Sequence, residues 1–211
     1  AFIAADSAGV IIVDISNPLS PTHVNTMDTG NFSNEITIVG DYAYVADYSY
    51  FTIIDVSTPT APELVVTYDI PGNAYSVDIV GNYAYIADYE TGLLVLDLTN
   101  PSIPTIADSY NTDCWAYGIS VTGDYAFVAD ASGGLVVINA ADPSNISLAG
   151  KYNLLRFPED IVVNGSYAYV SEHLYGLSIL NISDPHKPIW TGKCNMRDTQ
   201  SSIVDATVVG N

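Results

Sequence analysis

The hydrophobic and polar positions of this chain follow one pattern, which occurs five times. In each copy, an aromatic and aliphatic stretch ends in a polar turn, and an aliphatic run and a proline-containing turn follow. The copy AYIADYETGLLVLDLTNPSIPTIADSYN at 84–111 is representative. No stretch keeps the 3.6-residue period of an amphipathic helix, so the pattern predicts an all-β protein. The copies lie 41 or 42 residues apart and begin near Ala1, Ala43, Ala84, Ala126 and Ala168.

Each copy accounts for four short strands, which the third copy illustrates. The innermost is AYSVDIVG at 74–81, which ends in a Gly-Asn turn, and the second is YAYIAD at 83–88. The third, LLVLDLT at 93–99, loses the period-2 alternation, as a strand buried on both faces does. The outermost, PTIADSY at 104–110, begins with proline, which an edge strand tolerates because its missing N–H faces solvent.

A four-stranded unit of this length, repeated in tandem, is typical of a β-propeller. The alternative is a β-solenoid, whose coils are usually shorter and lack antiparallel hairpins. Because five copies fill the 211 residues, we predict one domain, 1–211, with five four-stranded antiparallel blades. The chain starts on a second strand, AFIAAD, and ends on an innermost strand, SSIVDATVVGN at 201–211. We therefore expect the ring to close by pairing of the C-terminal strand with the three N-terminal strands.

The repeated phrases also carry a resemblance. The runs GVIIVDISNP, GLLVLDLTNP and GLSILNISDP, with strands such as YAYVAD before equivalent runs, resemble the LVIVD-repeat family across all five copies. The resemblance implies a propeller of the kind found in secreted and cell-surface proteins of bacteria and archaea, and it implies no catalytic motif. Two positions depart from the pattern: Ala5 stands where the other copies have Asp or Glu, and Ile146 stands where they have a second proline.

Charge narrows the range of partners. Twenty-four acidic residues against five basic ones give a net charge of −19, which disfavours nucleic acid and anionic membrane surfaces. No apolar run is long enough to span a membrane. The chain has neither an initiator Met nor a signal-peptide pattern, as expected of a processed or excised chain. The whole basic set follows residue 150: Lys151, Arg156, Lys187, Lys193 and Arg197.

The loops that join one blade to the next, together with those between the second and third strands, lie on the face where propellers usually bind ligands. Acidic residues gather on this face and favour a cation site or an acidic funnel for a cationic ligand. Aromatic residues also gather in the loops between blades, where they could form a platform that stacks on a sugar or could instead fill gaps between blades. The candidate ligand-binding residues are Glu35, Asp160, Asp205, Tyr75, Trp115 and Tyr117, with Phe32 and Phe157 nearby in the sequence.

Two further acidic series recur with the repeat. Calcium is the one cofactor considered, and its weak candidate ligands are the acids that end the second strands: Asp47, Asp88, Asp130 and Glu172. The other interpretation is that each of these acids accepts backbone N–H hydrogen bonds in its own turn. A second series precedes the proline turn, where Asp and Asn interchange, so we predict turn capping for Asp14, Asp55, Asp97, Asn139 and Asn181. Candidate glycosylation sites are Asn31, Asn145, Asn164 and Asn181.

No catalytic combination is recognisable in the sequence. The three histidines are scattered, and Cys114 and Cys194 show neither metal-ligand spacing nor a disulfide pattern. We therefore predict a non-catalytic, extracellular or cell-surface propeller that binds a protein or glycan partner. One alternative is a subunit of a self-assembling fibre, in which the basic flank of one copy contacts the acidic flank of the next. A glycan-active enzyme is the second alternative.

Overall fold

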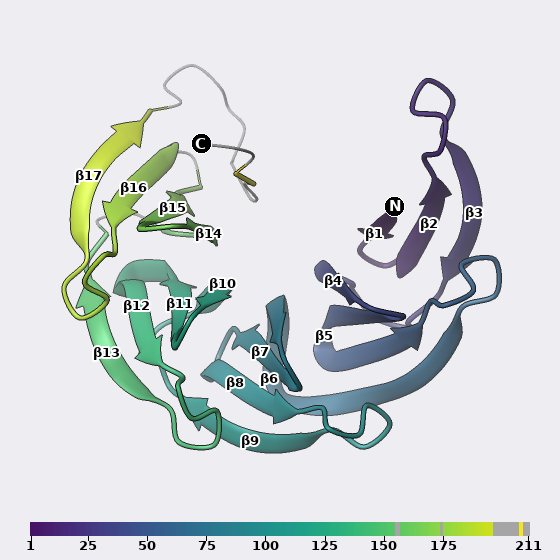
Figure 1. Ribbon diagram of the computed structural model, residues 1–211, viewed down its shortest axis with the longest axis horizontal. Helices are drawn as coiled ribbons and strands as arrows, with labels where there is room; N and C mark the ends of the chain where they lie inside the picture. Colours follow the sequence, from purple (N-terminus) through teal and green to yellow (C-terminus); the bar gives the residue numbers. More distant parts are fainter. Residues whose placement is uncertain (155–156, 174, 196–206, 209–211) are drawn as a thin grey trace.

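A computed structural model describes residues 1–154, 157–173, 175–195 and 207–208. Its strands form antiparallel sheets that follow one another around an arc (Figure 1). The only helical element in the described part is one 3-10 turn, η1, at Ala131–Gly133. No helix in the described part is long and apolar enough to cross a membrane. The prediction of an all-β propeller is therefore confirmed.

Each repeat largely supplies one blade. The N-terminal sheet contains three strands, β1 (Phe2–Ala4), β2 (Val10–Asp14) and β3 (Thr22–Met27). The first and second blades contain β4 (Glu35–Val39), β5 (Tyr42–Asp55), β6 (Glu63–Val80), β7 (Tyr83–Asp88), β8 (Gly92–Asp97) and β9 (Thr105–Tyr110). The third contains β10 (Ala116–Thr122), β11 (Tyr125–Asp130), β12 (Gly134–Asn139) and β13 (Ser147–Tyr152). The fourth contains β14 (Asp160–Asn164), β15 (Tyr167–Ser171), β16 (Leu177–Asn181) and β17 (Ile189–Cys194).

Two long strands, β5 and β6, each fill two strand positions. The first part of β5 pairs with β4 and its last part pairs with β6. The Val56 N–H, just after β5, donates to the Asp41 carbonyl, just before it, so the two ends of this strand lie side by side. β6 pairs with β5 from Glu63 to Asp69 and again at Ala74, and it pairs with β7 from Ala74 to Val80, so it runs from the outer edge of the first blade to the centre of the second. The first and second blades are therefore four-stranded, although they share one continuous sheet.

The prediction of five four-stranded blades is wrong. The described residues form four such blades, and the N-terminal sheet has three strands. The segment expected to supply its innermost strand, 201–211, lies outside the described residues except for 207–208, which form no strand. The chain begins on a second strand, so the first copy of the repeat supplies three strands. A fourth strand would have to come from the other end of the sequence, and the period of the repeat does not determine such a long-range pairing.

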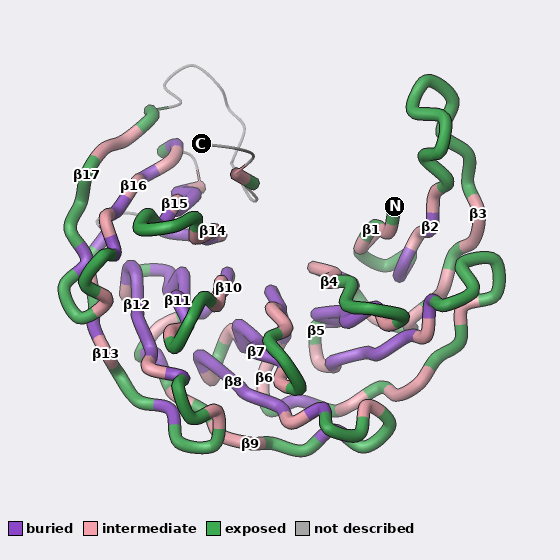
Figure 2. The backbone as a smooth tube through the Cα atoms, viewed as in Figure 1, coloured by how far each residue is buried: buried purple, intermediate pink, exposed green. Residues whose placement is uncertain are grey.

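The core lies between neighbouring blades. One cluster joins the first two blades, with Phe51 and Ile53 packed near Val77 and Leu94. Similar clusters join the second blade to the third, the third to the fourth, and the N-terminal sheet to the first. Figure 2 shows the middle strands of the blades largely buried, while the outer strands carry many exposed positions. The middle strands lack alternation because both of their faces are covered.

The predicted hairpins between the innermost and second strands are confirmed. Their glycines, Gly40, Gly81, Gly123 and Gly165, have φ values of 60°, 60°, 56° and 57°. This left-handed backbone suits glycine because it has no Cβ. These tight turns place the first residues of all the innermost strands at the opposite end of the blades, where the candidate site lies.

Candidate functional site

A cavity of about 410 Å³ lies at the end of the central channel where the innermost strands begin. All four complete blades contribute to it. Glu35 begins β4, Tyr75 lies in β6, Tyr117 lies in β10, and Asp160 begins β14. Four of the six predicted site residues therefore line one cavity. The full lining is Asn34, Glu35, Tyr75, Ser76, Tyr117, Glu159 and Asp160.

A second cavity continues along the innermost strands. It has a volume of about 310 Å³, shares Glu35 and Asp160 with the first, and adds the carboxylate of Asp78. No Lys or Arg lines either cavity among the described residues. The channel therefore presents negative charge to any solute that enters it.

Several polar groups in the channel also hold the blades together. Glu35 Oε2 accepts a hydrogen bond of 3.0 Å from the Val77 N–H of the next blade. Asp78 Oδ2 accepts one of 2.7 Å from the Val121 N–H in the same way. Burial raises the pKa of Asp78, although hydrogen bonds from the Val121 and Ile79 N–H groups partly oppose the shift. Glu35 and Asp78 thus have a structural role in addition to any ligand.

Four aromatic rings form a cluster at one wall of the cavity. Tyr75 stacks on Tyr89 with ring centroids 5.1 Å apart, and Tyr89 stacks on Trp115 at 5.3 Å. Tyr117 meets both Tyr75 and Tyr89 edge to face. Burial raises the pKa of Tyr75 and of Tyr117, so both phenols are neutral near pH 7. Trp115 does not line the cavity but extends the cluster outward, and it is half exposed.

Two residues at this site, Tyr89 and Glu159, were not predicted from the sequence. Tyr89 directly follows the acid that ends β7, and Tyr48 occupies the same place one repeat earlier, so the recurrence was a usable signal. Glu159 adjoins Asp160, but pattern alone gave no reason to choose between them. Its Oε1 lies 2.5 Å from His173 Nδ1, and its buried Oε2 has no hydrogen-bond partner among the described residues.

The acids that end the second strands lie elsewhere and are bonded within the protein. All four are buried, and each accepts a side-chain hydrogen bond. Thr29, Ser33 and Thr52 donate to Asp47, while Thr112 donates to Asp130 over 2.7 Å. Asp88 accepts from Thr91 at 2.5 Å, and Glu172 accepts from Ser178 at 2.9 Å. These donors are side-chain hydroxyls, and Thr29, Ser33 and Thr112 belong to other segments, so the acids link separate segments in addition to any bonds in their own turns. The described residues contain no metal-binding group of three or more His, Cys, Asp or Glu. A calcium site remains a prediction.

The second acidic series caps turns, as predicted. Each Asp or Asn side chain accepts a hydrogen bond from the backbone N–H two residues later, at 2.7–3.0 Å. These bonds lower the pKa of the three aspartates, chiefly through the serine or threonine two residues on. The series is Asp14, Asp55, Asp97, Asn139 and Asn181.

The remaining predicted residues are spread over the surface. Lys151 forms an ion pair with Asp113 at 2.8 Å and Lys193 forms one with Glu172, whereas Lys187 is exposed.

Among the candidate glycosylation sites, Asn145 and Asn164 are exposed. Asn31 Nδ2 donates to the Asp47 carbonyl, and Asn181 caps its turn. Phe32 packs edge to face on Tyr48, and Phe157 is half exposed. Asp205, Arg156 and Arg197 lie outside the described residues.

Similar solved structures share the fold. A functionally unknown protein from Desulfotomaculum acetoxidans DSM 771 is 16% identical with a TM-score of 0.76, over 91% of this chain and 65% of its own. A protein from Lactobacillus plantarum is 14% identical with a TM-score of 0.76, over 94% and 66%. The Cps50 (Swd1) β-propeller domain of Myceliophteria thermophila is 13% identical with a TM-score of 0.72, over 92% and 69%. This chain thus spans about two thirds of their length.

At these identities, the similarity shows the fold alone. No curated protein matches the sequence. The LVIVD repeat model matches five times, at residues 1–29, 32–70, 71–112, 115–154 and 158–196. These matches cover most of the chain and follow the repeats read from the sequence. The chain therefore belongs to the LVIVD-repeat family.

Proposed function

We propose that this chain is a non-catalytic binding module of an extracellular or cell-surface protein, and that its channel cavity receives a positively charged group. One observation carries the proposal: carboxylates and tyrosine rings from four separate blades converge on one cavity. Such a mixed lining suits an ammonium group, which the carboxylates attract and the π-faces of the rings also stabilise. A lysine side chain of a partner protein is one carrier of such a group.

The charge of the whole protein supports the same assignment. At a net charge of −19, the protein attracts cations and repels anions over a distance of about one Debye length, roughly 8–10 Å at physiological salt. Glu159 is the best local anchor, because it lines the cavity and one oxygen of its carboxyl group has no hydrogen-bond partner among the described residues. A ligand ammonium in the cavity would be attracted by this carboxylate.

The test is calorimetric titration with two matched probes, Nα-acetyl-lysine amide and the uncharged Nα-acetyl-norleucine amide. We expect the lysine probe to bind with a Kd of about 1 mM or tighter, more weakly as salt increases, and the norleucine probe not to bind. Glu159→Gln should weaken binding about tenfold. The control Asp124→Asn removes the same charge from an exposed hairpin and should leave binding unchanged.

Equal binding of both probes, or an equal loss in both variants, would refute a specific cation site. Turnover of a glycan or ester that disappears in Glu159→Gln would refute the non-catalytic assignment.

A further inference from the structure

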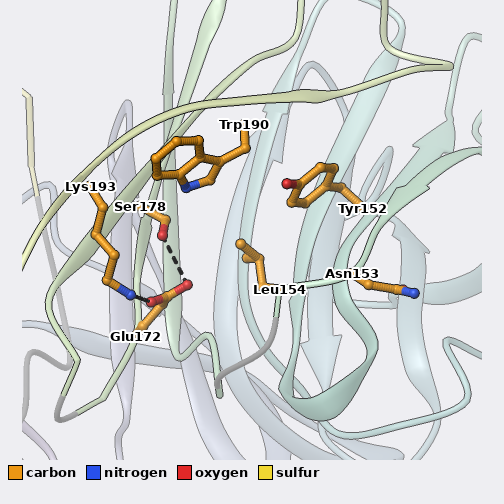
Figure 3. Close-up of a pocket in the computed structure, with 7 residues that line it drawn as sticks. All are labelled: Tyr152, Asn153, Leu154, Glu172, Ser178, Trp190 and Lys193. Atoms are coloured by element: carbon orange, nitrogen blue, oxygen red, sulfur yellow. Dashed lines mark hydrogen bonds and ion pairs between the residues drawn. The ribbon is translucent and has the colours of Figure 1, made fainter.

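A separate cavity of about 290 Å³ opens between the third and fourth blades. Figure 3 shows its walls: the rings of Trp190 and Tyr152 face one space from two sides, Leu154 lies below, and Glu172 lies at one end. Its lining does not overlap that of the channel cavity. It consists of Tyr152, Asn153, Leu154, Glu172, Ser178, Trp190 and Lys193.

The polar end of this cavity is a fixed, charge-neutral group. The Glu172 side chain is 3% exposed; it forms an ion pair with Lys193 and accepts a hydrogen bond from Ser178 Oγ at 2.9 Å. Among the described residues of the lining, Glu172 and Lys193 alone are charged. Their charges cancel, so the described lining favours neither an anion nor a cation, whereas the protein as a whole is strongly acidic. It does offer strong hydrogen-bond groups held in place beside apolar rings.

The preceding repeat provides an internal control for this site. Between the second and third blades, Thr112 closes the equivalent place by donating to Asp130, and Leu148 stands at the outer-strand position of Trp190. Between the third and fourth blades, four residues change together. Leu154 replaces Thr112, Glu172 replaces Asp130, Ser178 replaces Val136, and Trp190 replaces Leu148.

The propeller architecture does not require these four changes, because the preceding repeat builds the same sheets without them. Together they remove a closing hydroxyl group, lengthen the acid and replace an aliphatic wall with an indole. Trp190 is also 47% exposed, so much of its apolar surface remains in contact with water. Covering that surface with a ligand would be favourable.

We propose that this cavity binds a single neutral, polyhydroxylated ring, such as one unit of a saccharide. Its volume is near the lower end of ligand cavities, roughly 300 Å³, and fits one small ring. The apolar face of a sugar packs on Trp190 and Tyr152, and its hydroxyl groups bond to the Glu172–Lys193 pair and Ser178. A ligand without these hydroxyls would form fewer hydrogen bonds with the ion pair and Ser178, so the site selects for them.

The test uses 1H–15N NMR, because the chain contains two tryptophans and each indole N–H gives its own signal. Glucose, galactose, mannose and N-acetylglucosamine are titrated individually, with cationic glucosamine as the charged comparison. We expect at least one neutral sugar to shift the Trp190 signal, which Trp190→Leu identifies by its loss. The Trp115 signal, which reports on the channel cluster, should stay unchanged, so the outcome is independent of the function proposed above.

Two variants locate the site, and calorimetry measures the affinity. Trp190→Leu and Ser178→Val install residues that the preceding repeat carries at the same positions, so the fold should be kept, and each should weaken binding about tenfold or more. The proposal is overturned if no sugar shifts Trp190 up to roughly 50 mM, well above the Kd of about 1 mM for weak ligands. It is also overturned if both variants bind like the original protein, or if glucosamine binds more tightly than glucose.

Discussion

The two junctions that flank the third blade are built on the same backbone plan and differ in their side chains. At the junction with the second blade, the Thr112 hydroxyl donates a hydrogen bond of 2.7 Å to Asp130. At the junction with the fourth blade, Leu154 cannot donate, and an ion pair between Glu172 and Lys193 borders an open cavity. A repeat therefore specifies where the blades meet, and individual substitutions decide whether a junction is sealed or open.

The largest expected effect concerns two lysines at one register position. Lys193 of β17 lies opposite Ser178 of β16, and Lys151 of β13 lies at the equivalent position opposite Val136 of β12. Of these two lysines, only Lys193 forms an ion pair with a buried acid. Lys193→Met should cost about 3–5 kcal/mol, because Glu172 would remain charged and buried without its partner. Lys151→Met should cost less than about 1 kcal/mol, because Asp113 is 79% exposed. Urea unfolding measures both.

The double variant Glu172→Gln with Lys193→Met serves as the control, and it should recover much of the loss because no unpaired charge is left. Similar costs for the two single variants would show that the Glu172–Lys193 pair is not set apart by burial.

The next effect concerns two glycines, which also share one position of the repeat. A Cβ on Gly150 would lie 2.6 Å from the Pro185 carbonyl oxygen of the next blade, whereas a Cβ on Gly192 meets nothing described within 4 Å. Gly150→Ala should therefore force the third and fourth blades apart and cost about 1–3 kcal/mol. Gly192→Ala should be neutral or slightly stabilising. Thermal unfolding compares them, and equal melting temperatures would contradict the close contact.

The smallest effect is a dependence of stability on pH at the sealed junction. Burial raises the pKa of Asp130 to about 6 from an ordinary value of 3.8, although the Thr112 hydroxyl partly opposes the shift. Between these two pH values, the folded protein binds more protons than the unfolded chain. Stability therefore falls as pH rises through this window, and the loss is complete above the folded pKa.

Asp130→Asn keeps the acceptor for Thr112 and removes this titration, so its melting temperature should vary less between pH 4 and 7. Asp88 also has a pKa raised by burial, so some slope should remain. Asp124→Asn, at an exposed hairpin, should retain the original slope. An unchanged slope in Asp130→Asn would show that Asp130 does not titrate in this window.

Part of the candidate site was predictable from the sequence. Glu35 and Asp160 were identified because they start innermost strands, and strands that start at equivalent points of a propeller converge on its channel. Tyr75 and Tyr117 were identified because aromatic residues recur in the segments that join one blade to the next. Glu159 did not, because its role depends on which way its side chain points and on His173, which lies in another loop. The inter-blade cavity also escaped prediction, since its lining comes from segments between Tyr152 and Lys193 that meet only in the fold.

By itself, the sequence determined the all-β class, the repeat length, the hairpin glycines and the turn-capping Asp and Asn series. All of these depend on interactions between residues close together in the chain, which recur with every copy. Only the tertiary structure decided the number of complete blades, the partners of the buried acids and the places where cavities remain. These depend on contacts between separate blades, where the chemistry of one side chain determines whether a hydroxyl group, an ion pair or open space fills the gap.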